Sequence, residues 1–433
     1  MFEQNGLSLD QAPPISVVLG FFLIGSLFGI FSGASILYYG NQVFDISSTG
    51  AIVTIHLLAL GFAMSFMLGA LFQMLPVIAG VTIQNPITKT KPIQISIILG
   101  IVSLLSAFII HTPLLFLSAS IFLGSSLLYV AFIMGTKLYK LSNHSASSRG
   151  MLYAVMSLVI FVLLALYMTS TYAQIHSGVY FGSMKKLHYT FALFGWMTLL
   201  IESISFQTVE MFYVTPPYPK KLSKFTPIIS FSILIIISIM TLSNNILEKY
   251  MMLLLYSILI VYASYTLLRL SQRKRPLADA TIWFWRIAMS SLIASMSLPI
   301  INNFIQSKSI FDLSVVFFVS FVMSVIFAMF YKIVPFLTWF HLNAQGYFSA
   351  PMMHEVIHPK TAKKHMWLHL SMILFFLLSI FVSQAIYMAG ILMIASFIWT
   401  SYHIIHAQKL YKYTQENSEK FDMGSVNLNN SKE

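Results

Sequence analysis

The chain has 433 residues, of which 58% are hydrophobic and only 9% are charged. A soluble globular domain carries about 25% charged residues, so this composition excludes a water-soluble protein and predicts one that uses lipid as part of its solvent. Cysteine is absent, which excludes disulfides and thiolate metal sites. The net charge of +12 comes from Lys and Arg in short loops between apolar runs, so it indicates membrane topology and no nucleic-acid partner.

Apolar runs long enough to cross a bilayer, about 20 residues each, recur along almost the whole chain. They predict an all-α, polytopic membrane bundle of about twelve transmembrane helices over residues 1–410, followed by a polar tail over 411–433 that we expect to be disordered. The segment before the first run has no Lys or Arg, so we interpret that run as a retained helix and not as a cleaved signal peptide. The expected spans are residues 15–39, 50–76, 93–110, 114–136, 150–173, 187–213, 226–243, 250–269, 281–303, 313–339, 365–384 and 386–407.

The loop charges predict the direction of these spans. Basic residues gather in the loops on the side of the two chain ends, and few lie on the other side. Because cytoplasmic loops carry the excess of Lys and Arg, both ends are predicted to be cytoplasmic, in a bacterial inner membrane whose bilayer surrounds the bundle. The first set is Lys89, Lys91, Lys137, Lys140, Arg149, Lys220, Lys221, Lys224, Arg273, Lys274, Arg275, Lys360, Lys363, Lys364, Lys409 and Lys412, and the second is Lys185, Lys186, Lys249 and Lys308.

Three of the predicted helices, the second, sixth and tenth, end in similar sequence words. Gly61 precedes Gln73 by twelve residues, and Gly195 precedes Gln207 by the same twelve. These helices are four spans apart, so the pattern predicts three pseudo-repeated four-helix arcs. Chance similarity among apolar helices is the alternative. The words are LFQMLP at 71–76, SFQTVE at 205–210 and FYKIVP at 330–335.

His56 stands near the predicted periplasmic start of the second helix. An imidazole inside a membrane is costly unless it has a partner, so His56 is a candidate cofactor ligand. Steps of about 100° per residue put Met67 on the same face, together with small or soft side chains that suit a flat macrocycle. The alternative is a hydrogen bond from His56 to a neighbouring helix. The opposite face carries a stripe of small residues predicted to pack against another helix, namely Gly61, Ser65 and Gly69.

Acids and bases inside the sixth and tenth helices suggest a proton path. His188 and Glu202 lie fourteen residues apart on one face of the sixth helix. A carboxylic acid in mid-membrane is expensive, so Glu202 is neutral, paired or in a water-filled cavity. With Glu210 and Lys332 it forms the candidate path. The alternatives are a structural hydrogen bond from Glu202, and an ion pair of Glu210 with Lys332 or Arg286 that only fixes the bundle.

Histidines gather near the predicted cytoplasmic ends of the last two helices. His365 and His369 lie four residues apart, and His403 and His406 lie three apart, so each pair shares a helix face. The two helices form a hairpin that returns the pairs to similar depth. Four imidazoles there predict a site for copper or another transition metal. The alternative is interfacial histidines that extend to the membrane surface.

These features together resemble subunit I of the haem–copper oxidases: twelve helices with both ends inside, three four-helix arcs, and a His at the start of helix two. The NnrS-type haem and copper membrane proteins are a similar comparison. The segments HYTFALFGW at 188–196 and YVTPPYP at 213–219 are similar to divergent members of that superfamily. The resemblance implies a low-spin haem on His56 and a copper on the helix-six His, which His188 matches although it stands nearer the helix start.

The resemblance also implies histidines on helices seven and ten, but residues 227–243 and 313–339 contain none. A complete binuclear centre is therefore not expected. We predict at most one haem, with His56 as one ligand and His188, His111 or a Met such as Met67 as the other.

The favoured function is a haem-binding membrane redox protein that works with a redox partner or a respiratory complex. One alternative is a proton-coupled transporter, in which Pro76 and Pro335 shape broken helices. Another is a non-catalytic factor for metal handling or assembly. No catalytic residue is assigned, and whether the protein is an enzyme stays open.

Overall fold

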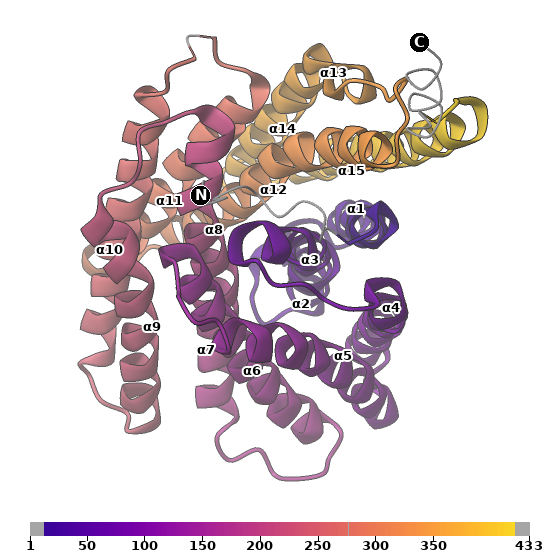
Figure 1. The fold of residues 1–433 in the computed structure, drawn as a ribbon. Helices are drawn as coiled ribbons and strands as arrows, with labels where there is room; N and C mark the ends of the chain where they lie inside the picture. The colour runs from indigo at the N-terminus through magenta and orange to yellow at the C-terminus, as the bar shows by residue number, and fades with distance from the viewer. Residues whose placement is uncertain (1–12, 276, 421–433) are drawn as a thin grey trace, which may run out of the picture.

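The computed structural model describes residues 13–275 and 277–420, and within these ranges the chain folds into helices without a strand (Figure 1). The elements are α1 (Ile15–Tyr39), η2 (Gly40–Phe44), α2 (Thr49–His56), η3 (Leu57–Met64), α3 (Ser65–Ala79), α4 (Pro86–Ile110), α5 (Pro113–Tyr139), α6 (Ala146–Tyr172), α7 (Phe181–Thr190), η4 (Phe191–Thr198), α8 (Leu199–Tyr213), α9 (Lys220–Leu242), α10 (Glu248–Ser271), α11 (Ala280–Ile305), α12 (Lys308–Ala344), α13 (Met353–Val356), α14 (Pro359–Ser379) and α15 (Ala385–Asn417). The predicted tail over 411–433 begins inside α15, which stays helical to Asn417; residues 421–433 lie outside the described ranges.

Eleven helical stretches in the described ranges are long and apolar enough to cross a membrane. This confirms the all-α polytopic membrane bundle. Three of the stretches are composite: Ile15–Phe44 joins α1 and η2, Thr49–Ala79 joins α2, η3 and α3, and Phe181–Tyr213 joins α7, η4 and α8. The expected span at 365–384 overlaps α14, which is not among the eleven and whose first turns carry Lys360, Lys363 and Lys364. A twelfth crossing therefore stays a prediction.

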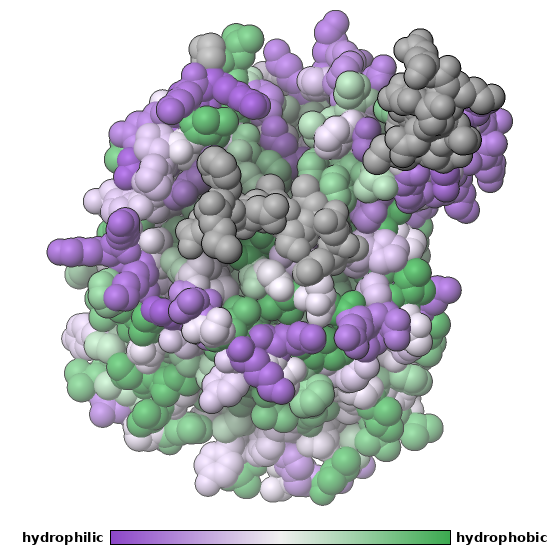
Figure 2. Space-filling model, viewed as in Figure 1, coloured by the Kyte–Doolittle hydropathy of each residue, from purple (hydrophilic) through white to green (hydrophobic). Residues whose placement is uncertain are grey.

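Apolar side chains cover much of the outside of the bundle. Figure 2 shows many hydrophobic residues, in green, among paler ones over the lower part of the visible face. Large side chains such as Val102, Ile109, Phe132 and Leu374 are more than half exposed. In water such a surface would drive aggregation, but in a bilayer it faces lipid tails that are equally apolar.

The first and last long helices of the chain, α1 and α15, pack along one another (Figure 1). The contact depends on glycines. A Cβ at Gly29 would lie 2.4 Å from the Phe397 ring, and one at Gly33 would lie 3.0 Å from the carbonyl oxygen of Gly390. Small residues allow this approach, and packing between helices replaces the hydrophobic effect inside a bilayer.

The second span packs on α1 through the predicted stripe of small residues. A Cβ at Gly61 would lie 2.5 Å from the Cβ of Phe28, and one at Gly69 would lie 2.9 Å from that of Phe21. The predicted role of this stripe is therefore confirmed. The helices are not broken at the prolines, since Pro76 lies within α3 and Pro335 within α12, so the expectation of breaks there was wrong.

Asp279 ties the start of α11 to α12. Its carboxylate accepts from the N–H of Ile282, at 3.0 Å, and so caps α11. It also accepts from the Lys332 ammonium, with Nζ 2.8 Å from Oδ2. Burial raises the pKa of Asp279, but the charge of Lys332 and the hydrogen bonds outweigh this effect and hold the pKa below its usual value. Lys332 is therefore paired with Asp279, and its predicted pairing with Glu210 was wrong.

Replacing Asp279 should separate its two roles. D279A loses the cap and the ion pair, so we expect a loss of about 1 kcal/mol of stability. D279N keeps a capping side chain and should lose less, because a partly exposed ion pair contributes little. Folding lowers the pKa of Asp279, so its ionised form stabilises the folded protein at any pH above the pKa of the unfolded state. This stabilisation is lost as the pH falls through the lower pKa of the folded state.

Thermal unfolding in detergent measures both effects. At neutral pH the midpoint should fall in the order wild type, D279N, D279A. Below the ordinary aspartate pKa the wild type should approach D279N. A D279A midpoint equal to that of the wild type at neutral pH would contradict this role.

Candidate functional site

Two helices of the bundle, the second and the sixth spans, change from α to π geometry at matching places. The π segments η3 and η4 are each eight residues long, and each begins four residues before its glycine, Gly61 in η3 and Gly195 in η4. A π segment widens the helix and often marks a functional position. The sequence did not predict these segments. Their matching positions favour the predicted repeat of these two spans, which itself stays a prediction.

His56 ends α2, directly before η3. Its Nδ1 lies 2.7 Å from the carbonyl oxygen of Ile52. Because a carbonyl only accepts, Nδ1 must carry the proton, and the neutral ring then presents a lone pair at Nε2. Among the described residues no hydrogen bond engages this Nε2. The alternative of a hydrogen bond to a neighbouring helix is not observed, because Ile52 lies in the same helix.

His188 repeats this arrangement on α7. Its Nδ1 donates to the carbonyl oxygen of Phe161 on α6 over 3.0 Å, and no described residue engages its Nε2. Metal-bound histidines commonly donate one ring N–H to a carbonyl, which fixes the tautomer and leaves the other nitrogen free for the metal. Both imidazoles are therefore held in the protonation state that a haem iron or another metal requires.

The two imidazoles belong to one region of the bundle. A charge on His56 would act on His188, although 132 positions separate the two residues in the sequence. Aromatic rings flank both: Phe108 is 5.7 Å from His56, and Phe161 is 5.8 Å from His188, between ring centroids. Both histidines are half-buried.

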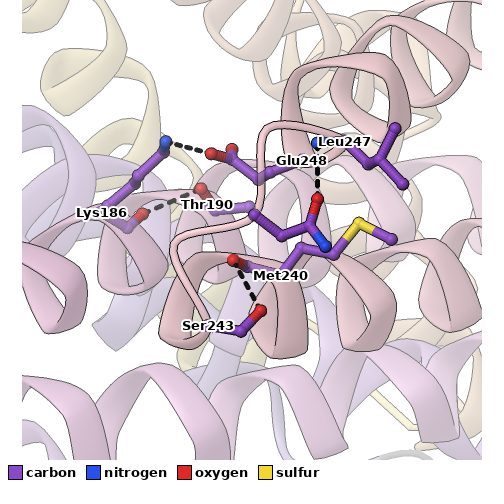
Figure 3. Close-up of polar contacts among 7 residues, drawn as sticks. Lys186, Thr190, Met240, Ser243, Leu247 and Glu248 are labelled. Atoms are coloured by element: carbon purple, nitrogen blue, oxygen red, sulfur yellow. Dashed lines mark hydrogen bonds and ion pairs between the residues drawn. The ribbon is translucent and has the colours of Figure 1, made fainter.

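An ion pair joins the second half of α7, beside His188, to α10. Two residues before it, the Lys186 ammonium contacts the Glu248 carboxylate at the start of α10 (Figure 3). Two residues after it, the Thr190 hydroxyl donates to the carbonyl oxygen of Lys186 over 2.8 Å. Since α10 is itself packed in the bundle, these contacts limit the movement of the helix that carries His188.

A small apolar cavity of about 60 Å³ lies between α3, α8 and α12, deeper along the same spans than the imidazoles. When the three repeated words are aligned, four positions of each helix coincide, and all of them line the cavity. They are 66, 67, 70 and 74 in α3, 200, 201, 204 and 208 in α8, and 325, 326, 329 and 333 in α12. Ser205 and Thr208 are the hydroxyl groups of the lining. This shared register favours the predicted repeat over chance similarity.

Met67 and His111 are less suited to complete a haem site with His56. Met67 lines the cavity, more than about 10 Å along the helix axis from His56, so the two cannot flank one iron. The predicted shared face assumed about 100° per residue, which the π segment η3 between the two residues does not follow. His111 is the exposed C-cap of α4, with a left-handed φ of 57°. Of the three candidate partners, His188 is the one whose Nδ1, like that of His56, is bonded to a carbonyl oxygen and whose Nε2 is free among the described residues.

Two of the histidines predicted to form a metal site, His365 and His369, belong to a hydrogen-bonded network instead. His365 is fully buried; its Nδ1 is 2.9 Å from the Tyr331 hydroxyl and its Nε2 is 2.6 Å from that of Ser396. His369 is also fully buried, with Nε2 2.8 Å from the Ser324 hydroxyl. The partners lie on α12 and α15, so the network joins three helices.

The predicted metal site of His365, His369, His403 and His406 does not form. Among the described residues no group of three or more His, Asp or Glu side chains is placed to hold a metal. His365 uses both ring nitrogens, and the ring of His406 stacks on Tyr402 with centroids 6.1 Å apart. The helix spacing brought His365 near His369 and His403 as expected, but hydroxyl groups from α12 and α15 engage both nitrogens of His365 and Nε2 of His369. These hydroxyl partners could not be predicted from the sequence because their contacts join distant segments.

The residues of the predicted proton path differ in their burial and in their hydrogen-bond partners. Glu202 is fully buried, and neither carboxyl oxygen has a hydrogen-bond partner among the described residues. Glu210 accepts from the backbone N–H of Tyr218 over 2.7 Å. Arg286 lies over the Trp283 ring, 4.7 Å from its centroid, so its predicted pairing with Glu210 was wrong. With Lys332 bound to Asp279, only Glu202 and Glu210 remain candidates for one path.

No family model matches the chain, and no curated protein matches it. The resemblance to haem–copper oxidase subunit I therefore stays a hypothesis based on the segments quoted above. The candidate site is defined by the two imidazoles, their carbonyl partners and the π segments that follow them.

Proposed function

We propose that the protein is a membrane haem-binding redox protein in which His56 and His188 ligate one haem iron. The observation that supports this most is the matched state of the two rings: each Nδ1 donates to a carbonyl, and each Nε2 is free among the described residues. A haem held by two imidazoles supplies one-electron transfer when bound.

The surroundings of the two rings agree with this role. The carbonyls of Ile52 and Phe161 would hold each ring in one orientation and make each Nε2 a better ligand. Phe108 and Phe161 provide apolar surface beside them. The cavity between α3, α8 and α12, at about 60 Å³, is far below the roughly 300 Å³ of ordinary cofactor pockets. The haem would therefore lie at the histidines and not in this cavity.

Removing either imidazole should remove the haem spectrum. We expect purified wild-type protein to show a Soret band and reduced-minus-oxidised haem peaks, and H56A and H188A to lose most of both. H176A is the matched control, because His176 lies in a loop where Nδ1 accepts from Gly178 N–H and Nε2 contacts the Ser170 hydroxyl. Its spectrum should equal that of the wild type.

Imidazole rescue separates ligation from folding. H56G with added imidazole should regain the haem peaks, because a free imidazole can replace the missing ligand, whereas a purely structural histidine would give no rescue. Wild-type protein that stays colourless when expressed with ample haem would contradict the proposal. An unchanged spectrum in the double variant H56A/H188A would also contradict it.

We further propose that the protein lies in the bacterial inner membrane with both ends in the cytoplasm. The distribution of Lys and Arg over the loops supports this orientation. The absence of Cys makes it easy to test, because a single introduced Cys is the only reactive thiol. In intact cells N245C should react with a membrane-impermeant maleimide, while N143C, equally exposed, should react only after lysis. The reverse pattern would contradict the orientation.

A further inference from the structure

Glu202 is a fully buried acid without a hydrogen-bond partner in the described part of the chain. It lies in the first turn of α8, inside the span Phe181–Tyr213, is fully buried, and has no partner for either carboxyl oxygen. A carboxylate there would carry the full cost of burying an unpaired charge, so the resting group is the neutral acid. The predicted structural hydrogen bond from Glu202 is not formed. Its presence therefore calls for a different role.

A group of hydroxyls surrounds the next turn of α8. The Tyr262 hydroxyl, from α10, donates to Ser205 Oγ over 2.8 Å, and both residues are fully buried. Ser205 follows Glu202 by three residues, and its hydroxyl donates to the Glu202 carbonyl oxygen over 2.7 Å. Tyr262 is close enough to Glu202 for a charge on one to act on the other. Ser205 also lines the cavity between α3, α8 and α12.

These hydroxyls continue towards the loop between α8 and α9. The Tyr218 hydroxyl donates to Thr266 Oγ1 over 3.0 Å and lies near Ser205 as well. Tyr218 belongs to that loop, and its backbone N–H donates to the Glu210 carboxylate. Burial raises the pKa of Tyr218, so its phenol keeps its proton and can both donate and accept. Glu210 is only partly buried and lies near the charge of Arg269.

We propose that Glu210, Tyr218, Thr266, Tyr262 and Ser205 form a proton route from the α8–α9 loop, on the predicted cytoplasmic side, to Glu202 beside the cavity. Glu210 is the entry, because it is a carboxylate at the loop end whose charge acts on the Tyr218 phenol. In the resting structure Thr266 Oγ1 donates to the Tyr262 carbonyl oxygen over 3.0 Å, and Ser205 Oγ donates to the Glu202 carbonyl oxygen. Each of these hydroxyls must therefore rotate before it can pass a proton on, and Ser205 must turn towards the Glu202 carboxyl group. Glu202 is the end group that stores the proton.

This proposal does not depend on the haem. The hydrogen bonds involved could instead serve only to hold α8, α10 and the loop together. The two roles differ in one measurable respect: a purely structural network has no effect on how fast Glu202 exchanges its proton with water.

Infrared spectroscopy of the full chain in lipid measures that exchange. A neutral Glu202 should give a carboxylic C=O band that disappears in E202Q and shifts when the sample is moved into D₂O. In Y218F and Y262F the shift should slow by at least about tenfold, since a missing relay group removes a proton-transfer step. E210Q should slow it in the same direction.

Two controls make the result decisive. Y256F removes a hydroxyl from the same helix, α10, at a residue that contacts Phe194 and lies outside the route, so its exchange rate should equal that of the wild type. If Y262F does not fold, S205A tests the same step. H56A should keep the band, so failure of the haem proposal would be distinguishable. A missing band in the wild type, or exchange that is equally fast in all variants, would overturn the proposal.

Discussion

Hydrocarbon offers no hydrogen bonds, and this constraint governs every polar group inside the bundle. Some of these groups find a partner within their own helix, as the Thr208 hydroxyl does by donating to the Ile204 carbonyl oxygen. Others find one on a neighbouring helix, as His365 does between two hydroxyls. Other buried polar atoms of the described residues have no hydrogen-bond partner, among them Trp196 Nε1, His369 Nδ1 and both carboxyl oxygens of Glu202. We assign a chemical role to the Glu202 carboxyl group and to the free Nε2 atoms of His56 and His188. The unpartnered amide of Gln73 has no explanation in the structure.

Close helix packing and an ion pair hold the helices around His56, His188 and Glu202 together. Glycines on α1 let α15 and the second span approach closely, and Asp279 joins α11 to α12. The α-helical pattern relaxes in η3 and η4. Each π segment directly follows or lies near a histidine with a free Nε2. A rigid bundle with two local irregularities beside two ligands is the arrangement expected of a site that must hold a cofactor in one position.

The sequence predicted the bundle because apolar runs of about 20 residues have no other stable environment. It also predicted the packing stripe at Gly61 and Gly69, since small residues at spacing four have one common use in membranes. The sequence did not predict side-chain contacts between distant segments. Lys332 forms an ion pair with Asp279, 53 positions away, and His365 is hydrogen-bonded to hydroxyls 34 and 31 positions away.

The candidate site was predicted in part. His56 and His188 could be selected because each is an imidazole in an apolar helix. The position of Met67, which lines the cavity, could not be predicted, because no sequence signal indicates the π geometry of η3. The hydroxyl route through Tyr218 and Tyr262 was also missed. A Tyr within the run 250–269 was a weak signal, since tyrosines are equally common at membrane interfaces.

The central claim is that both imidazoles bind the same iron. Electron paramagnetic resonance of the oxidised, haem-loaded protein tests this most directly, because two imidazole ligands give a low-spin ferric spectrum. The account predicts that spectrum for the wild type and a high-spin spectrum in any haem retained by H188A. A high-spin wild type, or a low-spin spectrum that is the same in H188A, would contradict it.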